Sequence, residues 1–276
     1  MNFIEKKYNC ELHGEVDYTA RLVWGVVHQD GHCEKWDDVD KTEPYCPTCA
    51  NEKRQKKEEE KRINEQKRSV ERDRLTRHSN LGLPKRFKNC TFESYIPTCE
   101  TAEKNLAICK QYVSNFDSVL EAGKGLIMIG KVGTGKTHLA CSIGYQLAED
   151  GYWPHYNTVS EMVRRVRATW SRNLTRYDSY SDCHVKLSEQ DVINDYVELD
   201  LLLIDEIGVQ SGTENERNII FTIIDERYQA MKPTIIISNF TEKELAPLIS
   251  ERSIDRIKQG SGTMTFDWSS YRTKAA

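Results

Sequence analysis

Several short apolar runs in this chain have the character of buried strands. Residues 125–129, 199–205 and 234–238 are short, mostly apolar stretches rich in Ile and Leu, as strands covered on both faces of a parallel sheet are. Apolar residues recur at helical spacing over residues 102–120 and again over residues 138–148. This alternation of strands and helices predicts an α/β fold with a parallel sheet.

Weaker patterns complete the second half of the chain. Residues 152–157 predict a strand, and Pro154 favours an edge position or a strand start. Residues 160–174 predict a helix with Ser160 as its cap. The tyrosine-rich, polar residues 177–187 predict a loop, and residues 250–257 predict a short helix.

Residues 51–80 form a highly charged segment that contains neither Pro nor Gly. Acidic and basic residues sit at helical spacing, which predicts a long solvated helix, either a spacer or an arm that docks a partner. Residues 81–84, Leu-Gly-Leu-Pro, would end this helix. We therefore expect three parts: a module at residues 1–50, a charged linker helix at 51–83 and a large domain at 84–276.

Composition narrows the class of protein. The 39 Lys and Arg residues against 43 Asp and Glu residues give a formal net charge of −4, so a polyanionic partner must meet a local basic patch. No apolar run approaches the roughly 20 residues of a membrane helix, and the first five residues lack a signal-peptide core. These features predict a cytoplasmic protein without membrane association. The nine cysteines are then expected to be reduced, with some of them binding a metal.

Two pairs of metal-ligand residues lie near the N-terminus. Cys10 and His13 form the first pair and Cys46 and Cys49 the second, each with two intervening residues. This spacing predicts a structural Zn²⁺ in a zinc-ribbon-like module, since four protein ligands leave no open position for catalysis. Cys33, which lies near His28 and His32, is a rival ligand. Two unrelated pairs of reduced residues are the other interpretation.

One motif predicts a nucleotide-binding site. Residues 130–137 fit the pattern G-x-x-x-x-G-K-[ST] of a phosphate-binding loop. A predicted strand precedes the motif and a predicted helix follows it, which is the context that directs backbone N–H groups at phosphates. The predicted nucleotide-binding residues are Gly130, Lys131, Val132, Gly133, Thr134, Gly135, Lys136 and Thr137.

Polar residues at the ends of two other predicted strands supply the remaining chemistry. Asp205 and Glu206 end one apolar strand, and Asn239 follows another. We expect Thr137 and Asp205 to bind Mg²⁺, Lys136 to neutralise phosphate charge and Glu206 to act as general base. Asn239 would hydrogen-bond the γ-phosphate or the attacking water; the alternative is a turn-forming Asn.

Two clusters of arginines also suggest function. Arg252 and Arg256 share one face of a short helix, and an arginine supplied to a neighbouring subunit's γ-phosphate would stabilise transition-state charge. The second cluster surrounds an aromatic residue, a combination suited to single-stranded DNA, although a surface helix with a core tryptophan is the alternative. Its members are Arg164, Arg165, Arg167, Trp170 and Arg172.

The order of these motifs resembles that of the DnaC family of bacterial replicative-helicase loaders. The resemblance rests on the phosphate loop, residues 204–210, Ser238-Asn239 and residues 251–256. It also rests on residues 89–95 and on the closing Phe-Asp-Trp-Ser-Ser-Tyr-Arg at 266–272. The resemblance implies an AAA+ ATPase core with a five-stranded parallel sheet, without a C-terminal lid. It also implies ATP bound between subunits, with Asn239 as sensor 1 and Arg256 as the arginine finger in trans.

The resemblance implies three partners: single-stranded DNA, a hexameric DnaB-type helicase and further copies of this chain. We therefore expect an ATPase that loads the helicase in replication initiation, with ATP, Mg²⁺ and a structural Zn²⁺ as ligands. The zinc-ribbon-like start departs from the family and leaves the surface that contacts the helicase open. The alternatives are an IstB-like transposition helper and a zinc-anchored adaptor that binds ATP with little hydrolysis.

Overall fold

The computed structural model describes residues 3–21, 46–171, 174–178, 180, 182–208, 213–249, 251–258 and 262–271. The chain divides into two compact units, residues 1–71 and 72–276. The division falls within the segment that we expected to be the linker helix, because the last residues of that helix pack onto the larger unit. Among the described helices, none is both long and apolar enough to span a membrane.

The smaller unit holds a β-hairpin and the first part of a long helix. Strands β1 (Phe3–Cys10) and β2 (Gly14–Arg21) pair in antiparallel fashion, with Cys10 opposite Gly14 at the turn. Gly14 has a φ of +70°, a conformation that glycine adopts without steric cost. Helix α1 (Pro47–Asn80) begins between Cys46 and Cys49, earlier than predicted, because proline suits the first turn of a helix.

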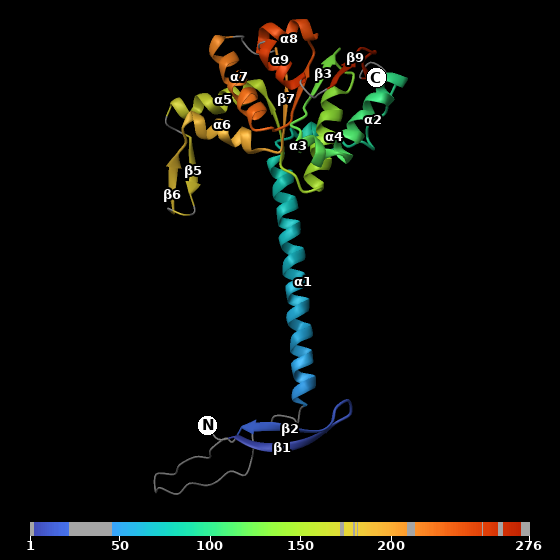
Figure 1. The fold of residues 1–276 in the computed structure, drawn as a ribbon, viewed down its shortest axis with the longest axis vertical. Coiled ribbons are helices and arrows are strands. Elements are labelled where there is room, and N and C mark those ends of the chain that lie inside the picture. Colours follow the sequence, from blue (N-terminus) through green and yellow to red (C-terminus); the bar gives the residue numbers. More distant parts are fainter. Residues whose placement is uncertain are drawn as a thin grey trace. The chain divides into compact units, whose positions relative to one another are not determined.

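A five-stranded parallel sheet forms the centre of the larger unit (Figure 1). Its strands are β3 (Leu126–Gly130), β4 (Pro154–Thr158), β7 (Leu201–Asp205), β8 (Thr234–Ser238) and β9 (Gly262–Phe266), in the order β4-β7-β8-β3-β9. All neighbouring strands are parallel. The predicted fold class is therefore confirmed. Pro154 was predicted to mark an edge position or a strand start, and both hold, since it begins β4 at the edge of the sheet.

Helices cover both faces of this sheet. Helices α5 (Val159–Trp170), α6 (Glu189–Glu198), α7 (Glu214–Gln229), α8 (Glu242–Ile249) and α9 (Glu251–Lys258) enclose one core. Helices α2 (Glu100–Ser114), α3 (Phe116–Glu121) and α4 (Lys136–Glu149) enclose the other, with a 3-10 turn at Lys85–Phe87. Alternate residues of each central strand enter the two cores: Leu202 and Ile204 face the first, whereas Leu201 and Leu203 face the second.

Three local predictions were wrong. Residues 102–120 form two helices, α2 and α3, separated at Asn115. The cap of α5 is Thr158 rather than Ser160, because the Thr158 side chain accepts a hydrogen bond from the Glu161 backbone N–H. Within residues 177–187, the structure forms an antiparallel hairpin of β5 (Thr175–Asp178) and β6 (Cys183–Lys186) instead of a loop.

Candidate nucleotide and metal sites

The phosphate loop connects β3 to α4 and is held at several points. Gly130, Gly133 and Gly135 all have positive φ values, 132°, 78° and 94°, so the loop follows a path that other residues rarely adopt. The backbone N–H of Lys131 donates to the Phe266 carbonyl at 2.8 Å. The N-terminus of α4 then directs its free backbone N–H groups toward the loop, which favours a bound anion.

Lys136 is buried at the first turn of α4. Its Nζ donates to the carbonyl oxygens of Gly130 at 2.7 Å and Lys131 at 2.6 Å. Burial lowers the pKa of the Lys136 ammonium to about 8, a shift that the Asp205 carboxylate partly opposes. A phosphate group in the loop would raise the pKa of this side chain again and stabilise its charged form.

Asp205 lies at the carboxyl end of β7 and is 7% exposed. Its Oδ2 accepts a hydrogen bond from Thr137 Oγ1 at 2.9 Å, and its Oδ1 accepts one from the Glu206 backbone N–H at 2.7 Å. Octahedral Mg²⁺, with ligand distances of about 2.1 Å, places neighbouring ligand oxygens about 3 Å apart. The two oxygens from Thr137 and Asp205 therefore fit Mg²⁺.

Glu206 and Asn239 border the same space. Glu206 is exposed and has a φ of +60°, an uncommon backbone conformation for a residue with a side chain. Asn239 follows β8 and is also exposed. Both residues line a cavity of about 600 Å³ together with Lys136, Thr137 and Asp205. The structure thus brings the predicted loop, the acid pair and the polar strand end together.

The cavity also has aromatic walls that we did not predict as part of the site. Phe87 and Tyr95 line it from the segment before β3, and Trp268 and Tyr271 line it from the segment after β9. The Tyr95 ring lies so close to Gly135 that a Cβ there would be 2.6 Å from the Tyr95 Cε2. The aromatic composition of residues 85–95 was a visible signal, but nothing in the sequence indicates that residues 266–271 contact the phosphate loop.

Arg256 lies outside this cavity and contacts α7 of its own chain. Its guanidinium is paired with the Asp225 carboxylate and lies 5.2 Å from the centre of the Tyr228 ring. Only 17% of the Arg256 side chain is exposed. The side chain of Arg252 lies outside the described residues. Arg256 is therefore not among the described residues that line the nucleotide cavity of this chain.

The described arginines of the predicted DNA-binding set lie close to carboxylates. Arg165 lies 2.5 Å from Asp195, and Arg167 lies 3.2 Å from Glu216. The half-exposed Trp170 donates its Nε1–H to Glu189 at 2.8 Å. Arg164 is the most exposed of the described members and lies 3.7 Å from Glu161. Arg172 lies outside the described residues. These pairs reduce the positive charge that α5 presents.

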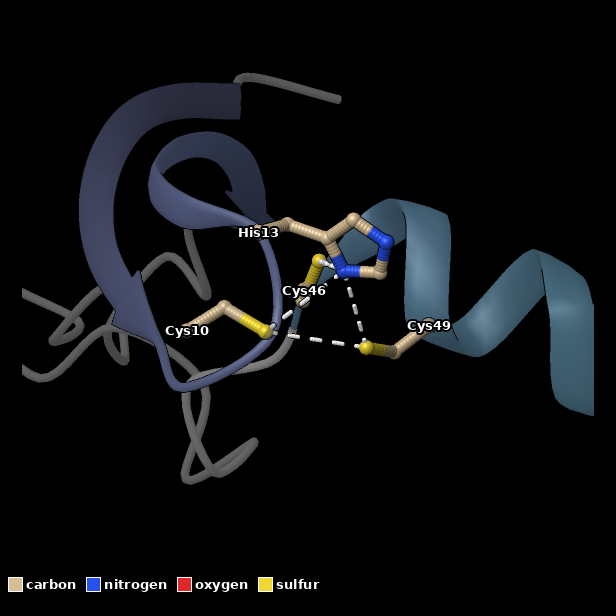
Figure 2. Close-up of side chains that lie close together, drawn as sticks. All are labelled: Cys10, His13, Cys46 and Cys49. Atoms are coloured by element: carbon tan, nitrogen blue, oxygen red, sulfur yellow. Dashed lines mark hydrogen bonds between the residues drawn. The ribbon is translucent and has the colours of Figure 1, made fainter.

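A second site lies in the smaller unit, where Cys10, His13, Cys46 and Cys49 converge (Figure 2). The Cys10 Sγ lies 3.6 Å from the Cys49 Sγ, and the His13 Nδ1 lies 3.6 Å from the Cys46 Sγ and 3.3 Å from the Cys49 Sγ. Tetrahedral zinc, with bonds of about 2.3 Å to sulfur and 2.0 Å to nitrogen, separates its ligand atoms by about 3.5–3.8 Å. The four predicted ligands therefore fit one zinc ion, and Cys33 lies outside the described residues.

The surroundings of this cluster favour metal binding. Hydrogen bonds from the Leu12 backbone and the His13 side chain lower the pKa of the Cys10 thiol to about 6, which favours the thiolate that a metal requires. The hydrogen bond to Cys10 is the largest cause that raises the pKa of Cys49, to about 11, so Cys49 would lose its proton on metal binding rather than before it. The second nitrogen of His13, Nε2, lies 3.6 Å from a Glu52 carboxylate oxygen. A carboxylate at this position orients a metal-binding imidazole.

The parallel sheet, the phosphate loop and the acid pair define a nucleotide-binding protein of the AAA+ class. The chain belongs to the family of IstB-like ATP binding proteins, whose model matches residues 57–275. It is 34% identical over 194 residues to the replicative helicase loader DnaC of Escherichia coli K12, a match that covers 70% of this chain and 73% of the relative. It is also 29% identical over 211 residues to the uncharacterized protein YdaV of the same organism, with 76% and 78% covered.

Solved structures agree with this assignment. The crystal structure of the DnaC helicase loader has a TM-score of 0.56 and 22% identity, covering 66% of this chain and 99% of that one. The replication initiator DnaA bound to AMPPCP and single-stranded DNA has a TM-score of 0.53 and 21% identity, covering 68% of this chain and 51% of that one. These structures support the fold, and the resemblance to the DnaC family is confirmed by the sequence relatives.

Proposed function

We propose that this protein is an ATPase that loads a hexameric DnaB-type replicative helicase onto single-stranded DNA in replication initiation. The observation that carries the proposal is the convergence of Lys136, Asp205 and Glu206 on one cavity in a chain that is 34% identical to a replicative helicase loader. ATP would favour the assembly of loader and DNA, and hydrolysis would release the loader.

The residues of the cavity support a hydrolytic role. Lys136 would leave the loop carbonyls and neutralise the β- and γ-phosphates, while Thr137 and Asp205 would bind Mg²⁺. Mg²⁺, when bound, supplies positive charge that stabilises the developing charge on the phosphates. Glu206 would accept a proton from the attacking water, and Asn239 would orient that water or the γ-phosphate.

We further propose that Arg256 acts on the nucleotide of a neighbouring copy of this chain. The absence of Arg256 from the described cavity of its own chain supports this role. The side chain is mostly covered, so the Asp225 pair would have to open when a second copy docks. An arginine finger supplied in this way accelerates hydrolysis by about 10³-fold or more.

For single-stranded DNA, we propose a binding region around the C-terminal end of α5. Among the described members of the predicted set, Trp170 and Arg164 are the most exposed, with Trp170 50% exposed. The paired Arg165 and Arg167 would instead hold α5 against α6 and α7. In the smaller unit, the four-ligand cluster would bind a structural Zn²⁺ that orders the module.

Helicase loading by two variants tests the proposal. DNA covered with a single-strand-binding protein is incubated with helicase and loader, and unwinding is measured. Lys136→Ala and Arg256→Ala are expected to reduce loading to near the level without loader, while Arg217→Ala, on the exposed face of α7, should behave like wild type. Normal loading by both variants would reject the role of ATP hydrolysis.

One rival from the sequence analysis is an IstB-like transposition helper, which would act on duplex DNA with a transposase. Binding of the intact protein to single-stranded and duplex DNA in the presence of ATP separates the two functions. A helicase loader is expected to prefer the single strand, and a preference for the duplex would support the rival. A static adaptor would show background ATP turnover even with DNA and helicase present.

A further inference from the structure

Tyr156 of β4 directs its hydroxyl group at Asp205. The Tyr156 OH donates to Asp205 Oδ2 at 3.0 Å, and the same oxygen accepts the Thr137 hydroxyl at 2.9 Å. The Asp205 Oδ1 accepts a third hydrogen bond, from the Glu206 backbone N–H, so the carboxylate accepts three hydrogen bonds in all. A carboxylate held by three hydrogen bonds has little rotational freedom.

The register of the sheet explains this contact. Strand β4 pairs with β7 in parallel, with Thr158 beside Asp205. Tyr156 precedes Thr158 by two residues, so both side chains project from the same face of the sheet. The tyrosine is therefore a diagonal neighbour of Asp205 and is long enough for its hydroxyl to reach the carboxylate.

The position of Tyr156 is fixed on several sides. Its backbone N–H donates to the Leu81 carbonyl at 2.8 Å, and its ring centre lies 6.2 Å from that of Phe87. The side chain is 3% exposed. A buried, well-packed donor holds its acceptor in one orientation without the entropy cost of ordering a mobile side chain.

Thr137 and Tyr156 have different roles at Oδ2. Thr137 would bind Mg²⁺ through a lone pair of its hydroxyl oxygen, and its hydroxyl hydrogen can still be donated to Asp205. Tyr156 faces Asp205 from the neighbouring strand and retains its hydrogen bond. We propose that Tyr156 is a positioning residue that holds the Asp205 carboxylate in the orientation that Mg²⁺ requires. This inference rests on the proposed ATPase function and adds a residue to it.

The variant Tyr156→Phe tests this role because it removes only the hydroxyl group. Binding of a fluorescent, non-hydrolysable ATP analogue is measured in EDTA and over a series of Mg²⁺ concentrations, alongside ATP hydrolysis. We expect unchanged analogue affinity in EDTA and an increase of about 10-fold in the Mg²⁺ concentration for half-maximal binding and hydrolysis, the usual size of a lost contact to a metal ligand.

Tyr112→Phe is the matched control, because it also removes a buried hydroxyl, one that donates to the Lys124 carbonyl at 2.8 Å outside the nucleotide cavity. It should leave the Mg²⁺ dependence unchanged. An unchanged Mg²⁺ dependence in Tyr156→Phe would overturn the inference. An equal loss of analogue binding with and without Mg²⁺ would also overturn it, since the role would then be structural. Absence of ATP binding by the wild-type protein would instead reject the proposed function.

Discussion

The side chain of Ser270 lies directly against the Cα of Gly133 in the phosphate loop. A Cβ at position 133 would lie 2.1 Å from the Ser270 Oγ, and Gly133 has a φ of +78°. The next residue, Tyr271, donates its backbone N–H to the Gly133 carbonyl at 2.9 Å. The segment after β9 therefore supports the loop from outside.

Substitution of Gly133 by Ala should weaken nucleotide binding for two reasons. The methyl group would displace Ser270, and the positive φ would become strained, at a cost of about 1–3 kcal/mol. We expect the affinity for ATP, measured with a fluorescent analogue, to fall by about tenfold or more. Combining Gly133→Ala with Ser270→Gly should restore part of this loss. Failure of the second change to restore any affinity would show that contact with Ser270 is unimportant.

Nucleotide binding is expected to take up a proton at alkaline pH. Burial lowers the pKa of Lys136 in the free protein to about 8, and bound phosphates should raise it. At pH 7 the ammonium is charged in both states, so no uptake is expected from it. At pH 9 the amine is mostly neutral before binding and charged after it, so the uptake should approach about one proton per nucleotide.

Calorimetry in two buffers with different ionisation enthalpies measures this uptake directly. The matched variant is Lys136→Arg, whose guanidinium stays charged throughout this range and should eliminate the uptake. If the wild-type protein takes up no proton at pH 9, then Lys136 is charged before the nucleotide binds.

Arg227 is a buried cation that should be essential for stability. It is 0% exposed, and its guanidinium donates to the carbonyls of Tyr196 at 2.5 Å, Leu199 at 2.9 Å and Pro233 at 2.6 Å. Two of these carbonyls belong to the end of α6 or the residue that follows it, where no helical partner is available. Burial lowers the pKa of Arg227 to about 9. This side chain therefore joins α6 to the start of β8.

The variant Arg227→Met should lower the free energy of unfolding by about 3–5 kcal/mol, because several buried carbonyls lose their donor. Urea unfolding followed by circular dichroism checks this value. Arg217→Met, on the exposed surface of the same helix, should change stability by less than about 0.5 kcal/mol. Similar effects of the two substitutions would contradict the role assigned to Arg227.

The central sheet and the nucleotide site were predictable because each depends on a local pattern. Apolar runs identified β3, β7 and β8, and parallel strands place their carboxyl ends at one edge. This edge is where Asp205 and Asn239 meet the phosphate loop. The prediction that the sheet has five strands came from the resemblance to a known family, because the pattern of apolar residues alone did not determine that number.

Contacts between distant segments were not predictable. The arginines of α5 suggested a basic surface, but Asp195 and Glu216, which pair with Arg165 and Arg167, come from α6 and α7. The β5–β6 hairpin has polar residues on both faces, so its pattern lacks the alternation that identifies a half-buried strand. The pairing of Arg256 with Asp225 likewise depends on how α9 packs on α7.

The cysteine–histidine cluster predicts one zinc ion per chain and dependence of the smaller unit on that ion. The four ligand atoms lie within 4.8 Å of one another and join the β1–β2 turn to the first turn of α1. Cys49→Ser should lower the zinc content measured by mass spectrometry and increase amide hydrogen exchange over residues 3–21, because a unit this small has little core of its own. Cys99→Ser, outside the cluster, should change neither. A wild-type protein without zinc, whose exchange is unaffected by a chelator, would show that packing alone orders the hairpin.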